Sequence, residues 1–141
     1  MKRQLESAGL AWETVEEKVR SGPPDAPKFE KLIFRAKGYS HLGKRGDLLL
    51  WFHTGRLMET IFYPEDVDGY LRALKAEGLA IPNMPADHVA VEIAAMPSTA
   101  NASTGDHTRV RLGRDTEQRV YVAWTDRRLQ REYLDWINAF A

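Results

Sequence analysis

The chain has 141 residues and carries 20 Lys plus Arg against 20 Asp plus Glu, so its formal net charge is zero. This length suits one domain with a two-layer core, and the balanced charge does not indicate a nucleic-acid or membrane partner. The chain contains no cysteine, which excludes disulfides and thiol nucleophiles; with no secretory leader or membrane-spanning run visible, we expect a cytoplasmic protein.

The first 22 residues show apolar side chains at helical spacing, with charged residues on the other faces. This pattern predicts an amphipathic N-terminal helix over 1–22, followed by a proline-rich linker over 23–27 and an α+β body over 28–141 within a single domain. The helix either covers its own sheet or packs on a partner helix across a dimer axis. The candidate dimer or partner interface is Leu5, Ala8, Trp12, Val15 and Val19.

Residues 28–37 fit two patterns. Leu32, Phe34 and Ala36 alternate with charged residues as in a strand, although the apolar residues of this segment also fit a helical face. We favour a strand, because aromatic and β-branched residues lead directly into the glycine-containing segment 38–45.

Residues 47–78 are the best-defined part of the pattern. Two apolar strands, 47–53 and 57–63, flank Thr54-Gly55, which is typical of a tight hairpin turn. The first strand is apolar on both faces, so we expect this hairpin to be central in the sheet. Pro64 is predicted to open an amphipathic helix that ends before Gly78.

The remaining segments predict a strand over 89–94, a flexible loop over 97–106, and a second hairpin formed by 110–112 and 120–124. Gly113-Arg114-Asp115 is assigned to its turn, and Thr125 is predicted to cap a final helix. The predicted fold is therefore α+β, with an antiparallel sheet of about five to six strands, the element order α-β-β-β-α-β-β-(β)-α, and helices packed on the sheet.

Catalytic patterns are not evident. Gly38 to Lys44 has the glycines and lysine of a phosphate-binding loop, but Arg45 replaces the expected Ser or Thr and no helix is predicted to follow. The four histidines (His41, His53, His88 and His107) have no metal-ligand spacing. We therefore expect no enzyme, no metal and no cofactor, while an active site assembled from dispersed residues stays open.

Basic residues gather in two segments, with aromatic residues interleaved. Such a combination on a sheet face can follow a phosphate backbone and stack bases. The alternative is that nearby acidic residues, including those of the first helix, neutralise these cations. The candidate nucleic-acid-binding residues are Lys28, Lys31, Arg35, Lys37, Tyr39, Lys44, Arg45, Arg109, Arg111, Arg119, Tyr121, Arg127 and Arg128.

The predicted order of elements resembles that of the small type III secretion chaperones and the related YbjN-like proteins. The resemblance covers most of the chain as an order of elements and involves no residue motif. It implies a non-enzymatic homodimer that offers its sheet and helices to a protein partner. Our first hypothesis is therefore a chaperone-like adaptor that binds a protein, and the alternative is a single-stranded DNA- or RNA-binding protein.

Overall fold

The computed structural model describes residues 12–20, 29–82, 91–95 and 108–140. In these ranges the chain forms one antiparallel sheet with the strand order β1-β2-β3-β4-β8-β7-β6-β5. The strands are β1 (Trp12–Arg20), β2 (Phe29–His41), β3 (Lys44–His53), β4 (Arg56–Pro64), β5 (Leu79–Ala80), β6 (Val91–Ala95), β7 (Thr108–Arg114) and β8 (Val120–Asp126). The described helices are α2 (Val67–Ala76) and α3 (Arg127–Phe140).

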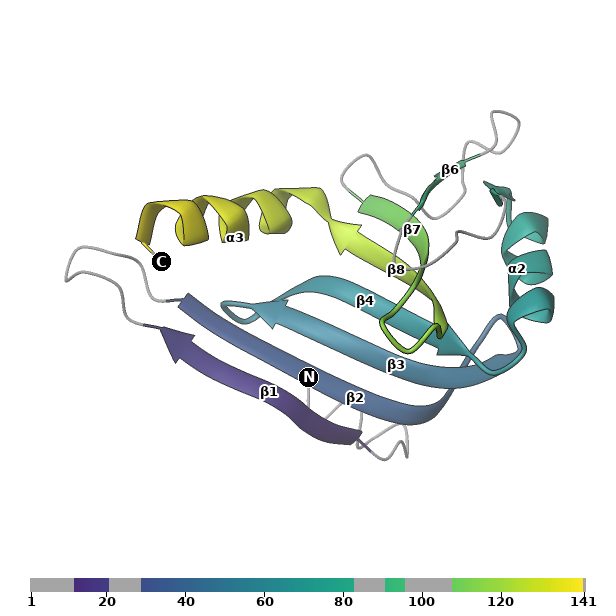
Figure 1. The fold of residues 1–141 in the computed structure, drawn as a ribbon, viewed down its shortest axis with the longest axis horizontal. Helices are drawn as coiled ribbons and strands as arrows, with labels where there is room; N and C mark the ends of the chain where they lie inside the picture. Colours follow the sequence, from purple (N-terminus) through teal and green to yellow (C-terminus); the bar gives the residue numbers. More distant parts are fainter. Residues whose placement is uncertain (1–11, 21–28, 83–90, 96–107, 141) are drawn as a thin grey trace.

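Strands β1 to β4 lie side by side along the lower part of the molecule, and β8 and β7 rise from β4 (Figure 1). Helix α2 stands at one end of these strands, while α3 leaves the end of β8 and extends over the other end (Figure 1). The two helices are therefore separated by the width of the molecule.

The hydrophobic core lies on one face of the sheet. Alternate residues of β2, β3, β4, β7 and β8 meet there, and Tyr70 and Leu74 of α2 close it. Tyr70 is completely buried and packs on Phe62, with ring centroids 4.8 Å apart. The core-facing set comprises Phe34, Ala36, Leu48, Leu50, Phe52, Phe62, Tyr70, Leu74, Leu79, Val110, Leu112, Val120 and Val122.

The sequence patterns predicted most of these strands correctly. The six expected strands are present, and the hairpin of β3 and β4 is central, as predicted, because β2 and β8 flank it. The strand assignment for 28–37 is confirmed, and β2 continues to His41 because a bulge between Ala36 and Tyr39 absorbs Gly38, which has φ +70°. Strands β1 and β5 are additional to the six.

The predicted N-terminal helix is wrong over residues 12–20, which form the edge strand β1. Trp12, Thr14 and Val15 favour extended backbone. The acidic side chains form ion pairs with the neighbouring strand instead of with residues of the same helix. Glu13 contacts Arg35 at 3.3 Å and Glu16 contacts Lys31 at 3.2 Å, both on β2. Leu5 and Ala8, the linker 23–27 and the loop 97–106 lie outside the described residues.

Three local predictions also need correction. Pro64 ends β4 instead of opening a helix, and Asp66 caps α2 by accepting a hydrogen bond from the Gly69 amide at 3.0 Å. Gly113 and Arg114 lie in β7, so of the three predicted turn residues only Asp115 lies between the strands. Asp126, not Thr125, caps α3, because the Thr125 side chain is buried and its hydroxyl donates to Glu59.

Candidate functional site

The face of the sheet opposite the core carries charged side chains from several strands. Strand register places Arg35 opposite Leu49, Asp47 opposite Tyr63, and Gly113 opposite Tyr121, and these positions alternate with the core residues. We call this surface the charged face. By strand register it comprises Lys31, Arg35, Asp47, Glu59, Tyr63, Arg109, Arg111 and Tyr121, and Arg119 joins it through its ion pair with Asp47.

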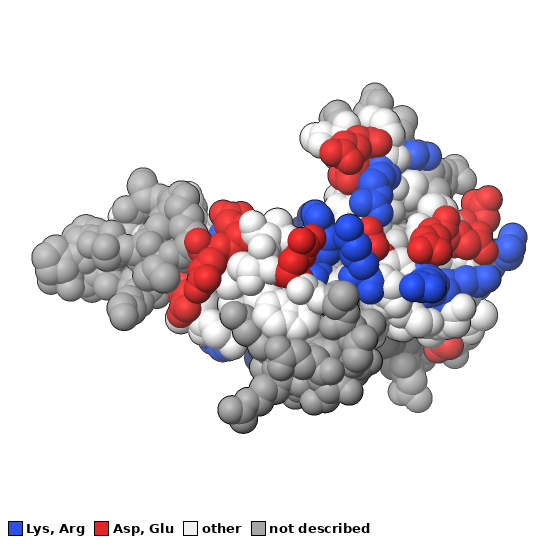
Figure 2. All heavy atoms as spheres, turned by 90° about the horizontal axis from the view of Figure 1, so that it is seen from below, with Lys and Arg blue, Asp and Glu red and all other residues white. Residues whose placement is uncertain are grey.

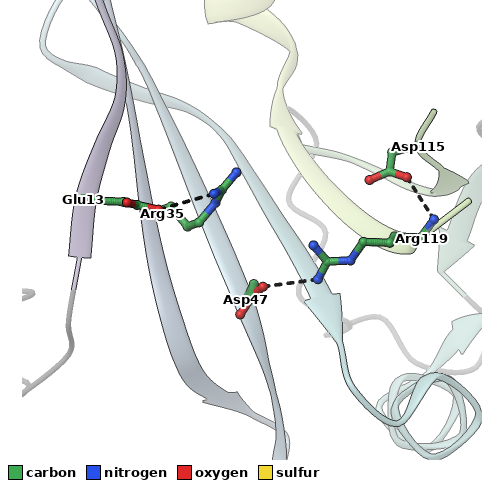
Figure 3. A network of polar contacts seen from close by, with 5 residues as sticks. All are labelled: Glu13, Arg35, Asp47, Asp115 and Arg119. Carbon is green, nitrogen blue, oxygen red and sulfur yellow. Dashed lines mark hydrogen bonds and ion pairs between the residues drawn. The ribbon is translucent and has the colours of Figure 1, made fainter. Parts of the chain in front are cut away.

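A cleft of about 140 Å³ opens on the charged face. Figure 3 shows the Arg119 guanidinium reaching Asp47 of β3 from the turn before β8, and the Arg35 guanidinium of β2 paired with Glu13 of β1. Arg119 contacts Asp47 at 3.2 Å, and Arg35 contacts Glu13 of β1 at 3.3 Å. The cleft is lined by Arg35, Asp47, Leu49, Tyr63, Asp115, Thr116, Glu117 and Arg119.

Two tyrosines form one wall of this region. The rings of Tyr63 and Tyr121 lie 5.8 Å apart, and the Arg119 guanidinium lies 4.5 Å from the centre of the Tyr63 ring. Burial raises the pKa of the Tyr63 phenol, with Asp115 acting in the same direction, so its hydroxyl keeps its proton at neutral pH and can donate a hydrogen bond.

Arg119 lies at the end of the turn between β7 and β8. One Asp115 carboxylate oxygen accepts from the backbone amides of Glu117 and Arg119, each at 2.9 Å. Gln118 adopts φ +65° in the same turn. This local hydrogen bonding fixes the backbone from which Arg119 reaches across to β3 (Figure 3).

A buried carboxylate supports the charged face from below. Glu59 is 6% exposed and accepts from the Arg111 guanidinium at 2.7 Å and from the Thr125 hydroxyl at 2.9 Å. Removal of either donor would leave the buried Glu59 carboxylate with one hydrogen bond fewer, which would lower the stability of the fold. Arg111 is therefore a structural residue as well as a member of the charged face.

At the far end of the charged face, Lys31 lies over Trp51, with the ammonium 4.5 Å from the ring centre, and pairs with Glu16. Trp51 and His53 in turn pack on Tyr133 of α3, at ring distances of 5.5 and 5.9 Å. Helix α3 therefore covers this end of the sheet.

The structure brings together only part of the predicted nucleic-acid set. Lys31, Arg35, Arg109, Arg111, Arg119 and Tyr121 share the charged face. Lys37 is exposed near Arg35 and Trp12, and Arg45 is exposed beside Gly38, while Lys28 lies outside the described residues.

Other members of that set lie elsewhere. Lys44 pairs with Asp66 at the start of α2, 3.2 Å away, and Tyr39 packs on Phe62 at the core rather than presenting an exposed ring. Arg127 and Arg128 are exposed in the first turn of α3.

His41 and His53 are the last residues of β2 and β3, where His41 is partly buried and His53 is buried. His41 lies 2.7 Å from the Tyr70 hydroxyl through Nδ1 and packs against Phe62 and Trp124. Burial lowers the pKa of both histidines. His88 and His107 lie outside the described residues.

The acidic and tyrosine partners of the arginines were not predicted from the sequence. Asp47, Glu59 and Tyr63 interrupt otherwise apolar strands, at positions that alternate with core residues. That alternation was the available sign that β3 and β4 carry polar groups on one face. The sequence did not reveal which cation would meet which anion, because partners such as Asp47 and Arg119 are distant in the chain.

The cations of the charged face are balanced by acids. Ion pairs join four of these cations to acids: Lys31 to Glu16, Arg35 to Glu13, Arg111 to Glu59 and Arg119 to Asp47. Figure 2 shows the same mixture on the molecular surface, where Lys and Arg side chains lie beside Asp and Glu. The neutralisation that we considered as the alternative to nucleic-acid binding is thus present for these four residues.

No protein-family model, curated protein or solved structure matches the chain. The likeness to type III secretion chaperones therefore stays a prediction. Within the described ranges, the side chains form no group of three or more His, Cys, Asp or Glu residues suited to a metal ion. Neither α2 nor α3 is long and apolar enough to cross a membrane.

Proposed function

We propose that the protein is a non-catalytic adaptor that binds a protein partner through the charged face. The observation that carries this proposal is the cleft in which Arg35, Arg119 and Tyr63 come together. Arginine and tyrosine are enriched in protein interfaces and dominate their binding energy, since each combines a large contact area with directional hydrogen bonds.

The charge distribution favours a protein as the partner. A protein surface carries both signs and can complement alternating guanidinium and carboxylate groups. Asp47 and Glu13 would repel a polyanion from the same arginines. The exposed pairs cost little to open, because a surface ion pair contributes about 0–1 kcal/mol, so a partner can exchange its own groups for them.

Affinity capture with charge variants tests the proposal. The wild-type chain should capture partner proteins from the cells that produce it. The Arg119→Glu variant should fail to capture them, since the substitution reverses a charge inside the cleft. Arg72→Glu makes the same change on an exposed position of α2 and should capture them as the wild type does. Equal capture by all three proteins would contradict the assignment of the charged face.

A second function, binding of single-stranded nucleic acid, is favoured by one observation: five cations and Tyr121 share a face. This function predicts that fluorescence anisotropy detects binding of a labelled oligonucleotide, and that affinity falls steeply as salt rises. Arg119→Glu is the informative variant, because Arg111 also holds the buried Glu59. Absence of binding at low salt would remove this alternative.

A further inference from the structure

A second hollow adjoins the cleft on the charged face. It measures about 170 Å³ and is lined by Trp12 and Glu13 of β1 and by Arg35 and Lys37 of β2. Arg35 also lines the cleft of about 140 Å³. The two hollows therefore meet at this arginine, and together they run across the strands from the β1 edge of the sheet toward the turn between β7 and β8. We call them the cross-strand groove.

Two ion pairs neutralise four of the charged side chains that line the cross-strand groove. Arg35 contacts Glu13 at 3.3 Å, and Arg119 contacts Asp47 at 3.2 Å (Figure 3). The charges of these residues cancel within each pair. The charged side chains at the two ends of the groove therefore determine which charges a partner must carry.

The two ends of the groove carry opposite charge. Lys37 at the β2 end is exposed and forms no ion pair with any residue of the described ranges. At the other end, Asp115 and Glu117 line the cleft, and Glu117 likewise has no ion pair within the described part of the chain. A complementary partner therefore places an acid against Lys37 and a base against Glu117.

The dimensions of the sheet set the spacing of these two charges. Lys37 lies on β2, and the turn that carries Glu117 reaches back over the sheet, because Arg119 at its end contacts Asp47 of β3. Two or three strand spacings separate the ends, which is about 10–14 Å, and an extended chain advances about 3.3 Å per residue. Leu49 lines the groove between the ends and offers an apolar contact.

From this arrangement we infer that the cross-strand groove binds an extended segment of the partner protein that carries one acidic and one basic residue, about three or four positions apart, with an apolar residue between them. The inference rests on the proposed adaptor function and adds the chemistry of the bound segment. A wholly acidic or wholly basic segment would meet a like charge at one end of the groove, which disfavours its binding.

Selection from a library of random peptides tests this chemistry with the full chain. Peptides enriched on the wild type should share an acidic and a basic residue about three or four positions apart, with an apolar residue between them. The Arg72→Glu variant, which is changed on α2 and outside the groove, should enrich the same peptides. Enriched peptides without this pattern, or no enrichment at all, would overturn the inference.

Charge-reversal variants test the assignment of the two ends. An enriched peptide is compared, by fluorescence anisotropy, with a version whose acid is changed to Lys and a version whose base is changed to Glu. Lys37→Glu should prefer the version with two basic residues, and Glu117→Lys the version with two acidic residues, each by about tenfold in dissociation constant. Both positions are exposed, so the variants should fold as the wild type does.

Unchanged preferences in these two variants would overturn the inference alone. The proposed function would then still be decided by whether Arg119→Glu loses the proteins that the wild type captures.

Discussion

Gly113 of β7 and Tyr121 of β8 face each other on the charged face. A Cβ atom at Gly113 would lie 2.6 Å from the Tyr121 hydroxyl oxygen and 2.7 Å from the ring carbon that bears it. The position of the Tyr121 ring therefore requires a glycine at position 113. The Tyr121 ring in turn packs against the ring of Tyr63. One missing side chain thus determines how the aromatic wall of the cleft is built.

Gly113→Ala should destabilise the protein by about 1–3 kcal/mol, the usual cost of forcing extra volume into a packed site. In a Tyr121→Ala background the same change should cost much less, because the obstructing ring is absent. Urea unfolding of the four proteins measures this coupling. Equal costs in both backgrounds would show that the tyrosine does not occupy the space above Gly113.

His41 gives the stability a pH dependence. Burial lowers its pKa below the ordinary value of 6.5, and only the opposing charge of Glu77 acts to raise it. The unfolded chain therefore binds a proton at His41 before the folded chain does. The contribution of this residue to stability is complete above about pH 6.5 and is lost as pH falls toward the folded pKa.

We expect the free energy of unfolding to decrease between pH 7.5 and pH 5.5, and to decrease less in His41→Gln. Glutamine does not titrate, and its amide oxygen can accept the hydrogen bond from Tyr70. His53 has the same sign of pKa shift, so some dependence remains in the variant. Identical slopes for the two proteins would mean that His41 does not contribute.

At the scale of elements, α3 begins where Asp126 accepts from the amides of Arg128 and Leu129 at 2.9 and 3.1 Å. Asp126→Ala should lower stability by about 1 kcal/mol, whereas Asp126→Asn keeps a capping oxygen and should cost a few tenths. Thermal unfolding followed by circular dichroism measures the difference. Equal loss in both variants would indicate that the carboxylate charge, and not the cap, stabilises the helix.

Local patterns predicted the elements whose neighbours are close in sequence. The turn at Thr54-Gly55 and the apolar stripe of Val67, Tyr70 and Leu74 contain all that is needed to form a hairpin and a helix. Residues 12–20 were mispredicted because their acidic side chains fit a solvated helix face equally well. Their partners Lys31 and Arg35 belong to another strand, and only the folded chain pairs them.

Prediction of the candidate site was limited by the same kind of pairing between strands that are distant in sequence. The shared face of Arg109, Arg111, Arg119 and Tyr121 could be predicted, because alternation within one hairpin places them together. Asp47 and Glu59 could not be assigned as their partners, since these acids belong to strands that are distant in sequence. Sequence alone therefore indicated a basic surface, whereas the structure shows a mixed one.

At the scale of the molecule, the core and α2 occupy one face of the sheet, and the charged face occupies the other. A partner can therefore contact the cleft without disturbing the buried side chains.

Site-specific photo-crosslinking in the producing cells tests the central claim most directly. A photoreactive amino acid replaces Thr116, which is exposed and lines the cleft, or Arg72, which is exposed on α2. The proposed function predicts a discrete adduct between this chain and another protein from position 116 and none from position 72. Adducts from position 72 alone, or from neither position, would contradict the assignment of the charged face as the binding surface.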